Sequence, residues 1–258
     1  MDIIIRNKKK ITALAESLQE YSFMTVEMIK KVSKIRRNKT AIIEEMYTIG
    51  TQSLFIVVLG GLFVGIILAL EVGYRFEMFG AKTMVGRTVS LGILRELGPV
   101  ISGLLLAART GSKNTSEIGS MKLSEQLDAM RAFGTDPVEK LVLPRMLASV
   151  VMFLPLTLLA DFAGIVGGMF VSSAWLSLDK SIFWNAALYG LQMKDLYVGF
   201  SKPIVFGFFI STISCFMGMK TSGGTTGLGR SVINSVVTSS IVVLIIDFIF
   251  TKVVWEIM

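Results

Sequence analysis

Long apolar runs separated by short charged loops are the first pattern along this chain. Windows of about 19 residues, the length at which a helix crosses a bilayer, identify candidate spans. There are five of them, at approximately 49–70, 89–108, 146–176, 198–219 and 232–250. The third run is 31 residues long. That is too long for one upright helix and short for two helices with a turn, so we expect one long or tilted helix, with six spans as the alternative.

The basic residues between the runs predict the orientation. If the N-terminus is cytoplasmic, the segments 1–48, 109–145 and 220–230 lie inside and hold 18 of the 26 Lys and Arg residues. Cytoplasmic loops carry such an excess, so five spans with an inner N-terminus and an outer C-terminus fit the pattern. The basic start is not followed by the apolar core of a cleavable signal peptide, and we expect none.

The segment before the first span has the spacing of an amphipathic helix. Apolar or aromatic side chains fall on one helical face at Ile11, Leu14, Leu18, Tyr21, Met28, Val32 and Ile35. Six basic residues follow between 30 and 39. A basic amphipathic helix ahead of a span is typical of the membrane interface, so we expect an interfacial region over 1–45 and a membrane domain over 46–258. A short coiled coil or packing on a partner protein is the alternative.

The loop 109–145 is the only sizeable charged loop after the first span. Ser124 is a candidate N-cap for a short helix with Glu125 and Asp128 in its first turns, where the helix dipole favours acids. Gly134 is a suitable C-terminal stop, and Asp136-Pro137 begins a turn. Leu123, Leu127 and Met130 share one face. This face must be buried, either on the chain's own helix ends or in a groove of a cytoplasmic partner, and the residues leave both open.

Composition agrees with a membrane protein and excludes several functions. The chain is 52% hydrophobic and 17% charged, with a mean hydropathy of +0.66, whereas soluble domains have about 25% charged residues. One Cys and no His exclude a disulfide framework, a Cys-rich or His-ligated metal site, and a His-dependent nucleophile. Composition leaves carboxylate or Ser-Lys chemistry open, although we expect no metal and no catalytic residue in this chain. The net charge of +7 is explained by topology and anionic lipid, so nucleic acid is not needed as a partner.

Several charged residues interrupt the apolar runs. Arg95, Glu96, Lys202 and Asp247 all fall toward the predicted outer ends of their spans. A charge in the hydrocarbon costs about 2.5–3.5 kcal/mol, so such side chains face protein or a wet cavity. Their formal charges cancel, which allows pairing between helices, and Arg95 and Glu96 as neighbours are better paired with other groups than with each other. Asp161 lies deeper in the third span, where we favour structural pairing.

Glycines mark places where spans bend or approach closely. Gly98 and Pro99 loosen the second span just inside the charged pair, as a hinge beside a cavity or as a packing kink. Two small-residue motifs, at Gly61 and Gly65 and at Gly164 and Gly168, allow close helix contact but do not identify the dimer face. The chain has no Walker A motif, so any ATPase must be a separate polypeptide.

An ordered series of motifs resembles the MlaE family, the permease subunits of Mla/Mce-type ABC transporters. The motifs are Leu94-Arg-Glu-Leu-Gly-Pro-Val, Glu117-Ile-Gly-Ser-Met, Ser124-Glu-Gln-Leu-Asp-Ala-Met, Thr135-Asp-Pro and Leu143-Pro-Arg. The resemblance runs from about residue 45 to the C-terminus. It implies an all-α integral membrane protein with an interfacial helix, five transmembrane helices and a cytoplasmic coupling helix between the second and third spans.

The resemblance also implies a function and partners. The chain would be a homodimeric, non-enzymatic permease of the inner membrane that moves phospholipid to or from an MCE-domain membrane protein. Such trafficking between inner and outer membranes serves outer-membrane lipid asymmetry. This chain would hold no cofactor, because ATP and Mg would bind to a separate cytoplasmic ABC ATPase subunit.

The resemblance assigns residues to two sites. Arg95, Glu96, Lys202 and Asp247 would lie by the lipid cavity, where the two cations attract a phosphate and Glu96 opposes or gates it. Glu117, Glu125, Gln126 and Asp128 would belong to the region that couples to the ATPase.

Two other functions are alternatives. An ion-coupled secondary transporter would use Glu96 and Asp247 as proton carriers, but no internal repeat or pair of broken helices supports it. A membrane enzyme would need a Ser elbow or a paired-acid motif, and neither stands out.

Overall fold

The computed structural model describes the backbone of residues 2–257, and it describes the side chains of these residues except 2–11, 13, 14, 34, 255 and 257. All regular structure within 2–257 is helical, as predicted. The α-helices are α1 (Asp2–Lys30), α2 (Lys39–Met78), α3 (Val85–Gly92), α4 (Gly98–Leu106), α5 (Ser112–Leu123), α6 (Gln126–Ala132), α7 (Leu143–Trp175), α8 (Lys180–Tyr189), α9 (Met193–Met219) and α10 (Gly224–Ile257). They are joined in part by 3₁₀ segments η1 (Lys31–Asn38) and η2 (Lys82–Met84), and by π-helical turns η3 (Ile93–Leu97), η4 (Ala107–Gly111) and η5 (Val138–Val142).

Five helical stretches are long and apolar enough to cross a bilayer. They are Ile35–Met78, Lys82–Leu123, Val138–Trp175, Met193–Met219 and Gly224–Val254. The prediction of five spans is confirmed. The third apolar run forms the single helix α7, which contains Pro155 without a break, and therefore does not form two spans. The chain is a multi-pass, all-helical membrane protein.

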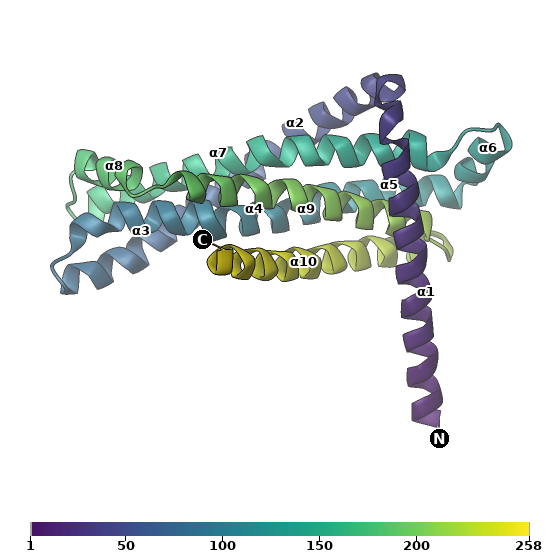
Figure 1. Cartoon of the computed structure of the whole chain (residues 1–258), viewed down its shortest axis with the longest axis horizontal. Helices are drawn as coiled ribbons and strands as arrows, with labels where there is room; N and C mark the ends of the chain where they lie inside the picture. Colours follow the sequence, from purple (N-terminus) through teal and green to yellow (C-terminus); the bar gives the residue numbers. More distant parts are fainter. Residues whose placement is uncertain (1, 258) are drawn as a thin grey trace.

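The span helices lie side by side in one elongated bundle (Figure 1). The helix α8 lies at one end of this bundle, beside α3, and α6 lies at the opposite end, beyond α5. We call these the α8 end and the α6 end. The helix α1 runs across the bundle at the α6 end, and α10 ends on the side toward α8. Polar groups at the two ends are therefore far apart.

The two glycine motifs meet each other within this chain. A Cβ atom added at Gly65 would lie 1.9 Å from the carbonyl oxygen of Gly164, and one at Gly61 would lie 2.2 Å from that of Ala160. Both distances are shorter than any real contact, so only glycine allows α2 and α7 to pack this closely. The small-residue motifs are thus used to join the first and third spans.

The helix α1 is attached to the bundle by part of its predicted apolar face. The Tyr21 hydroxyl lies 2.7 Å from Thr212 Oγ1, and its ring meets the edge of Phe216. Burial raises the pKa of Tyr21 above its ordinary value. Met28 is fully buried and Val32 is packed beside the same cluster. This half of the face therefore packs on the chain itself, while the side chains of Ile11 and Leu14 lie outside the described residues.

A second apolar face of α1 is exposed in the single chain. It consists of Leu18, Phe23, Val26 and Ile29, and the exposed basic residues Lys30, Arg36, Arg37 and Lys39 follow it. A basic helix with an uncovered apolar face suits a membrane interface. The interfacial role stays a prediction, and the exposed face shares only Leu18 with the face that the spacing indicated.

The short helix in the charged loop begins one residue later than predicted. Ser124 ends α5, and its hydroxyl donates to the Ser120 carbonyl at 2.9 Å. Glu125, at a φ of 58°, precedes α6 instead, so the prediction of Ser124 as the N-cap is wrong. Gly134 closes the loop at a φ of 71°, as expected. Leu127 is fully buried in the cluster that contains Met28, so the apolar face of α6 packs on this chain's own helices.

Candidate functional site

A fully buried lysine lies at the centre of the charged residues. Lys202 Nζ in α9 is 2.8 Å from Glu96 Oε2 and 2.8 Å from Asp247 Oδ1, the second contact being an ion pair without hydrogen-bond alignment. The ammonium also donates to the Arg95 carbonyl at 2.8 Å and to Thr251 Oγ1 at 3.0 Å. Residues from η3, α9 and α10 therefore meet at one buried cation.

This cluster confirms the expected pairing between helices. Glu96 accepts hydrogen bonds from Lys202 and, at 2.9 Å, from the Thr251 hydroxyl. A buried ammonium is tolerated only when opposite charges and hydrogen bonds replace its water, and two carboxylates provide them here. The cluster joins the second, fourth and fifth spans near their ends.

Arg95 has a different acidic partner, Asp195. Arg95 Nε donates to Asp195 Oδ1 at 2.6 Å, and a second guanidinium nitrogen contacts the same oxygen. Asp195 is almost fully buried in the first turn of α9. Its other oxygen, Oδ2, accepts a hydrogen bond from the backbone N–H of Gln192 at 2.8 Å. Sequence reasoning missed Asp195, since an acid in a first helical turn suggests a cap. The structure shows that it both caps α9 and pairs with Arg95.

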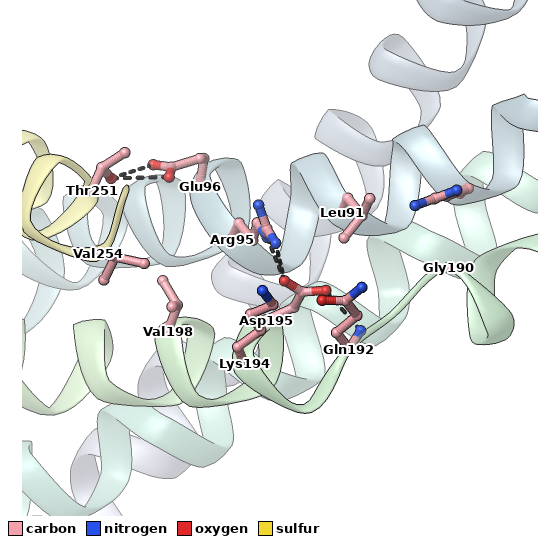
Figure 2. Close-up of a pocket in the computed structure, with 11 residues that line it drawn as sticks. Leu91, Arg95, Glu96, Gly190, Gln192, Lys194, Asp195, Val198, Thr251 and Val254 are labelled. Atoms are coloured by element: carbon pink, nitrogen blue, oxygen red, sulfur yellow. Dashed lines mark hydrogen bonds and ion pairs between the residues drawn. The ribbon is translucent and has the colours of Figure 1, made fainter. Parts of the chain in front are cut away.

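A cavity of about 190 Å³ opens beside these pairs (Figure 2). It is lined by Arg87, Leu91, Arg95, Glu96, Gly190, Gln192, Lys194, Asp195, Val198, Thr251 and Val254. An adjoining, more open hollow of about 540 Å³ shares five of these residues, namely Arg87, Leu91, Arg95, Glu96 and Thr251. Of the four predicted cavity residues, Arg95 and Glu96 line it. Lys202 contacts Glu96, and Asp247 contacts Lys202, but neither of them is among the lining residues.

The backbone that carries Arg95 and Glu96 is irregular. They lie in the π-helical turn η3, and the Gly98 amide at its end bonds to the Ile93 carbonyl five residues back. Pro99 lies in the first turn of α4, where its missing donor costs little. The second span therefore stays helical, with a π turn directly before Gly98 and Pro99, and the hinge or kink expected there stays a prediction. Such π turns are frequent at functional sites, and this one directs two adjacent charges to different partners.

Asp161 lies against this irregular turn. A Cβ atom at Gly98 would overlap Asp161 Oδ1 at 1.6 Å, so the carboxyl group occupies the space that glycine leaves. Asp161 is buried, and its Oδ1 has no hydrogen-bond partner in the part of the chain described. The ion pairing that we favoured for Asp161 is not found among these residues.

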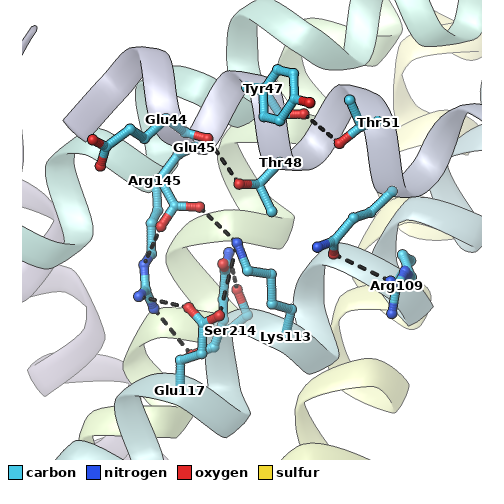
Figure 3. A network of polar contacts seen from close by, with 12 residues as sticks. Glu44, Glu45, Tyr47, Thr48, Thr51, Arg109, Lys113, Glu117, Arg145 and Ser214 are labelled. Atoms are coloured by element: carbon cyan, nitrogen blue, oxygen red, sulfur yellow. Dashed lines mark hydrogen bonds and ion pairs between the residues drawn. The ribbon is translucent and has the colours of Figure 1, made fainter. Parts of the chain in front are cut away.

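A second polar network lies toward the α6 end (Figure 3). Arg145 of α7 contacts Glu117 of α5 at 2.8 Å and Glu45 of α2 at 3.1 Å. Lys113 of α5 contacts Glu45 at 3.0 Å. These contacts join the first three spans, and Glu117, which the resemblance assigned to coupling, is part of that intramolecular network.

The remaining predicted coupling residues are exposed on or beside α6. Glu125, Gln126 and Asp128 face outward while Leu127 faces the core. Asp128 contacts Lys122 at 2.9 Å and Arg131 at 3.1 Å. The hydrogen bond from Lys122 lowers the pKa of Asp128, which keeps it ionised at neutral pH. The outer face of α6 is therefore polar, with a compensated charge at Asp128.

Known proteins resemble the chain over most of its length. The family described as Permease MlaE matches residues 42–253. A probable ABC transporter permease protein of Synechocystis is 35% identical over 234 residues, which is 91% of this chain and 89% of that protein. A probable ABC transporter permease protein of Rickettsia bellii is 33% identical over 96% of both chains. The intermembrane phospholipid transport system permease protein MlaE of Haemophilus influenzae is 34% identical over 249 residues, 96% of this chain and 95% of that protein.

Proposed function

The chain belongs to the MlaE family of ABC transporter permeases, and we propose that it moves phospholipid in an ATP-driven transporter. The observation that carries this proposal is the cavity at one end of a five-span bundle, where charged and apolar side chains meet. A phospholipid needs both, because its headgroup is charged and its chains are apolar. The Haemophilus relative is named for intermembrane phospholipid transport, which supports the same cargo.

The energy source in this proposal is a separate ABC ATPase. This chain has no Walker A motif, so ATP and Mg would bind to the ATPase subunit, while the permease itself holds no cofactor and catalyses no reaction. The exposed residues Glu125, Gln126 and Asp128 are the surface that we assign to that subunit. Since the apolar face of α6 is already buried, docking would use polar contacts around Glu125.

The assembly in this proposal is a homodimer that works with an MCE-domain membrane protein. The helix α10 leaves much apolar surface uncovered in the single chain, at Ile233, Val237, Ile241, Leu244, Ile245, Phe248 and Ile249. A second copy would cover part of this face, and lipid the rest. The proposed setting is the inner membrane, with the α6 end in the cytoplasm and the α8 end, which carries the cavity, facing the MCE-domain partner.

The charged residues have specific tasks in this mechanism. Lys202 fixes Glu96 in the cavity wall, and Asp195 fixes Arg95, so the site is pre-organised before lipid enters. The ion-coupled alternative receives less support, because Glu96 and Asp247 both contact Lys202.

Reconstitution with the ATPase tests the proposal. The chain, co-purified with its ABC ATPase and placed in liposomes, should move a fluorescent phospholipid between membranes only when ATP and Mg are present. Glu125→Arg should reduce ATPase co-purification at least tenfold by removing a docking charge, whereas Glu71→Arg, an exposed acid on α2, should leave it unchanged. Equal transfer without the ATPase, driven by a proton gradient, would contradict the proposal.

A further inference from the structure

The charge balance of the cavity differs from what the sequence suggested. Arg95 is held by Asp195, and Lys202 is held by Glu96 and Asp247. A cation that is already bonded to carboxylates attracts an anion weakly, since the nearby negative charge cancels its field. The phosphate-binding role first considered for Arg95 and Lys202 must therefore fall to other residues.

Two other basic residues line the same cavity, Arg87 of α3 and Lys194 of α9. Both are exposed, and neither side chain forms an ion pair or hydrogen bond with any described residue of the chain. Three basic side chains, Arg87, Arg95 and Lys194, line the cavity against two acidic ones, Glu96 and Asp195. The cavity therefore keeps a net positive charge, and Arg87 and Lys194 carry the cationic groups available to a ligand.

The Arg87 side chain packs directly against a glycine, Gly190. Gly190 ends α8, and a Cβ atom there would lie 2.4 Å from Arg87 Cγ and 3.1 Å from Arg87 Cβ. The stem of Arg87 thus passes directly over Gly190, which also lines the cavity. Any larger residue at 190 would displace the Arg87 side chain. The second cation, Lys194, lies beside Asp195 in the first turn of α9, at the edge of the cavity that Figure 2 shows.

The other walls indicate an amphiphilic ligand. Leu91, Val198 and Val254 line the cavity with the charged groups. An acidic protein surface would need the cations but not these apolar walls, whereas a lipid uses both. Guanidinium and ammonium groups bind phosphate oxygens through charge-assisted hydrogen bonds. We propose that Arg87 and Lys194 bind the phosphodiester of a lipid headgroup at the mouth of the cavity, an assignment that rests on the proposed function.

Binding to the purified chain tests this assignment without the ATPase. The probes are a short-chain phosphatidylglycerol, the diacylglycerol with the same acyl chains, and inorganic phosphate. In Arg87→Gln/Lys194→Gln, binding of phosphatidylglycerol should weaken at least tenfold, and binding of the diacylglycerol should stay unchanged. The control is Lys252→Gln, an exposed lysine near the cavity that does not line it, which should bind phosphatidylglycerol like the native chain.

A second variant keeps the charges of Arg87 and Lys194 but displaces the Arg87 side chain. Gly190→Ala should weaken phosphatidylglycerol binding in the same direction as Arg87→Gln, since it displaces the arginine stem. The proposal is overturned if the double variant binds phosphatidylglycerol normally, or if it loses the diacylglycerol to the same extent. It is also overturned if inorganic phosphate binds the native chain as tightly as phosphatidylglycerol. If the double variant binds lipid normally but loses an acidic partner protein, the two cations serve protein docking instead.

The two proposals can fail separately. If the double variant binds phosphatidylglycerol more weakly but diacylglycerol normally, and transfer does not require ATP, the phosphate site stands and the ABC mechanism is removed. If ATP-driven transfer is normal but the double variant binds lipid like the native chain, the ABC mechanism stands and the phosphate site is removed.

Discussion

At the scale of single residues, burial decides which charged side chains matter for stability and which for ligands. Lys202 has no exposed surface and contacts two carboxylates. Arg87 and Lys194 are exposed at a cavity and have no such partners among the described residues. The first kind of residue stabilises the arrangement of helices, and the second kind stays available to an anion.

Removal of the buried cation should unfold the site. Lys202→Met leaves Glu96 and Asp247 next to each other without their counter-charge, and breaking a buried pair in this way costs about 3–5 kcal/mol. We expect a clear fall in the midpoint temperature of thermal unfolding of the detergent-purified protein. Lys252→Met, which removes a lysine that is 66% exposed, should change it little. Equal midpoints for the two variants would show that the cluster contributes nothing to stability.

At the scale of helices, the packing of α2 on α7 depends on direct contact between backbones. The glycines at 61, 65 and 164 allow this contact, and the polar network of Glu45, Lys113, Glu117 and Arg145 lies where the same helices approach the α6 end. The network therefore joins α5, which directly precedes α6, to the first and third spans.

A pair of glycine substitutions tests the contact between α2 and α7. Gly65→Ala places a methyl group 1.9 Å from a backbone oxygen of α7, and such overpacking costs about 1–3 kcal/mol. Gly229→Ala is the matched control, because it lies in α10 with open space around it. That change should leave stability equal or raise it by up to about 1 kcal/mol. Denaturant unfolding in mixed micelles measures both, and a Gly65→Ala protein as stable as Gly229→Ala would contradict the close contact.

At the scale of the whole molecule, the bundle has two chemically different ends. The α6 end combines α1 and the charged loop, and the α8 end carries the cavity and the Lys202 cluster. With five spans, the two ends face opposite sides of the membrane. The excess of basic residues in segments 1–48, 109–145 and 220–230 predicts that the α6 end is cytoplasmic.

Cysteine labelling tests this orientation. Cys215 is the only cysteine and is buried, so the native chain should react little with an impermeant maleimide. Tyr189 at the α8 end and Phe133 beyond α6 are 89% and 87% exposed. Tyr189→Cys should label in right-side-out vesicles, and Phe133→Cys only in inside-out vesicles. The reverse pattern would overturn the orientation, and labelling of both sites from one side would contradict a single membrane crossing by α7 between them.

The sequence by itself determined the class of fold and the presence of a polar cluster, and it predicted five spans, whereas the single helix α7 ruled out the alternative of six. Each follows from transfer energies that depend on local composition: an apolar run of sufficient length enters a bilayer, and a charge within it must find a partner.

Only the tertiary structure decided which partner each charge has and which surface stays free. Arg95 and Asp195 are 100 residues apart in sequence, and Lys202 and Glu96 are 106 apart. No local pattern links such residues, because their contact depends on how the second and fourth spans pack together. The same packing neutralised Arg95 and Lys202, covered one face of α1 and of α6, and left Arg87 and Lys194 beside the cavity. Helix formation is a local property of this chain, whereas the availability of a charge depends on everything that folds around it.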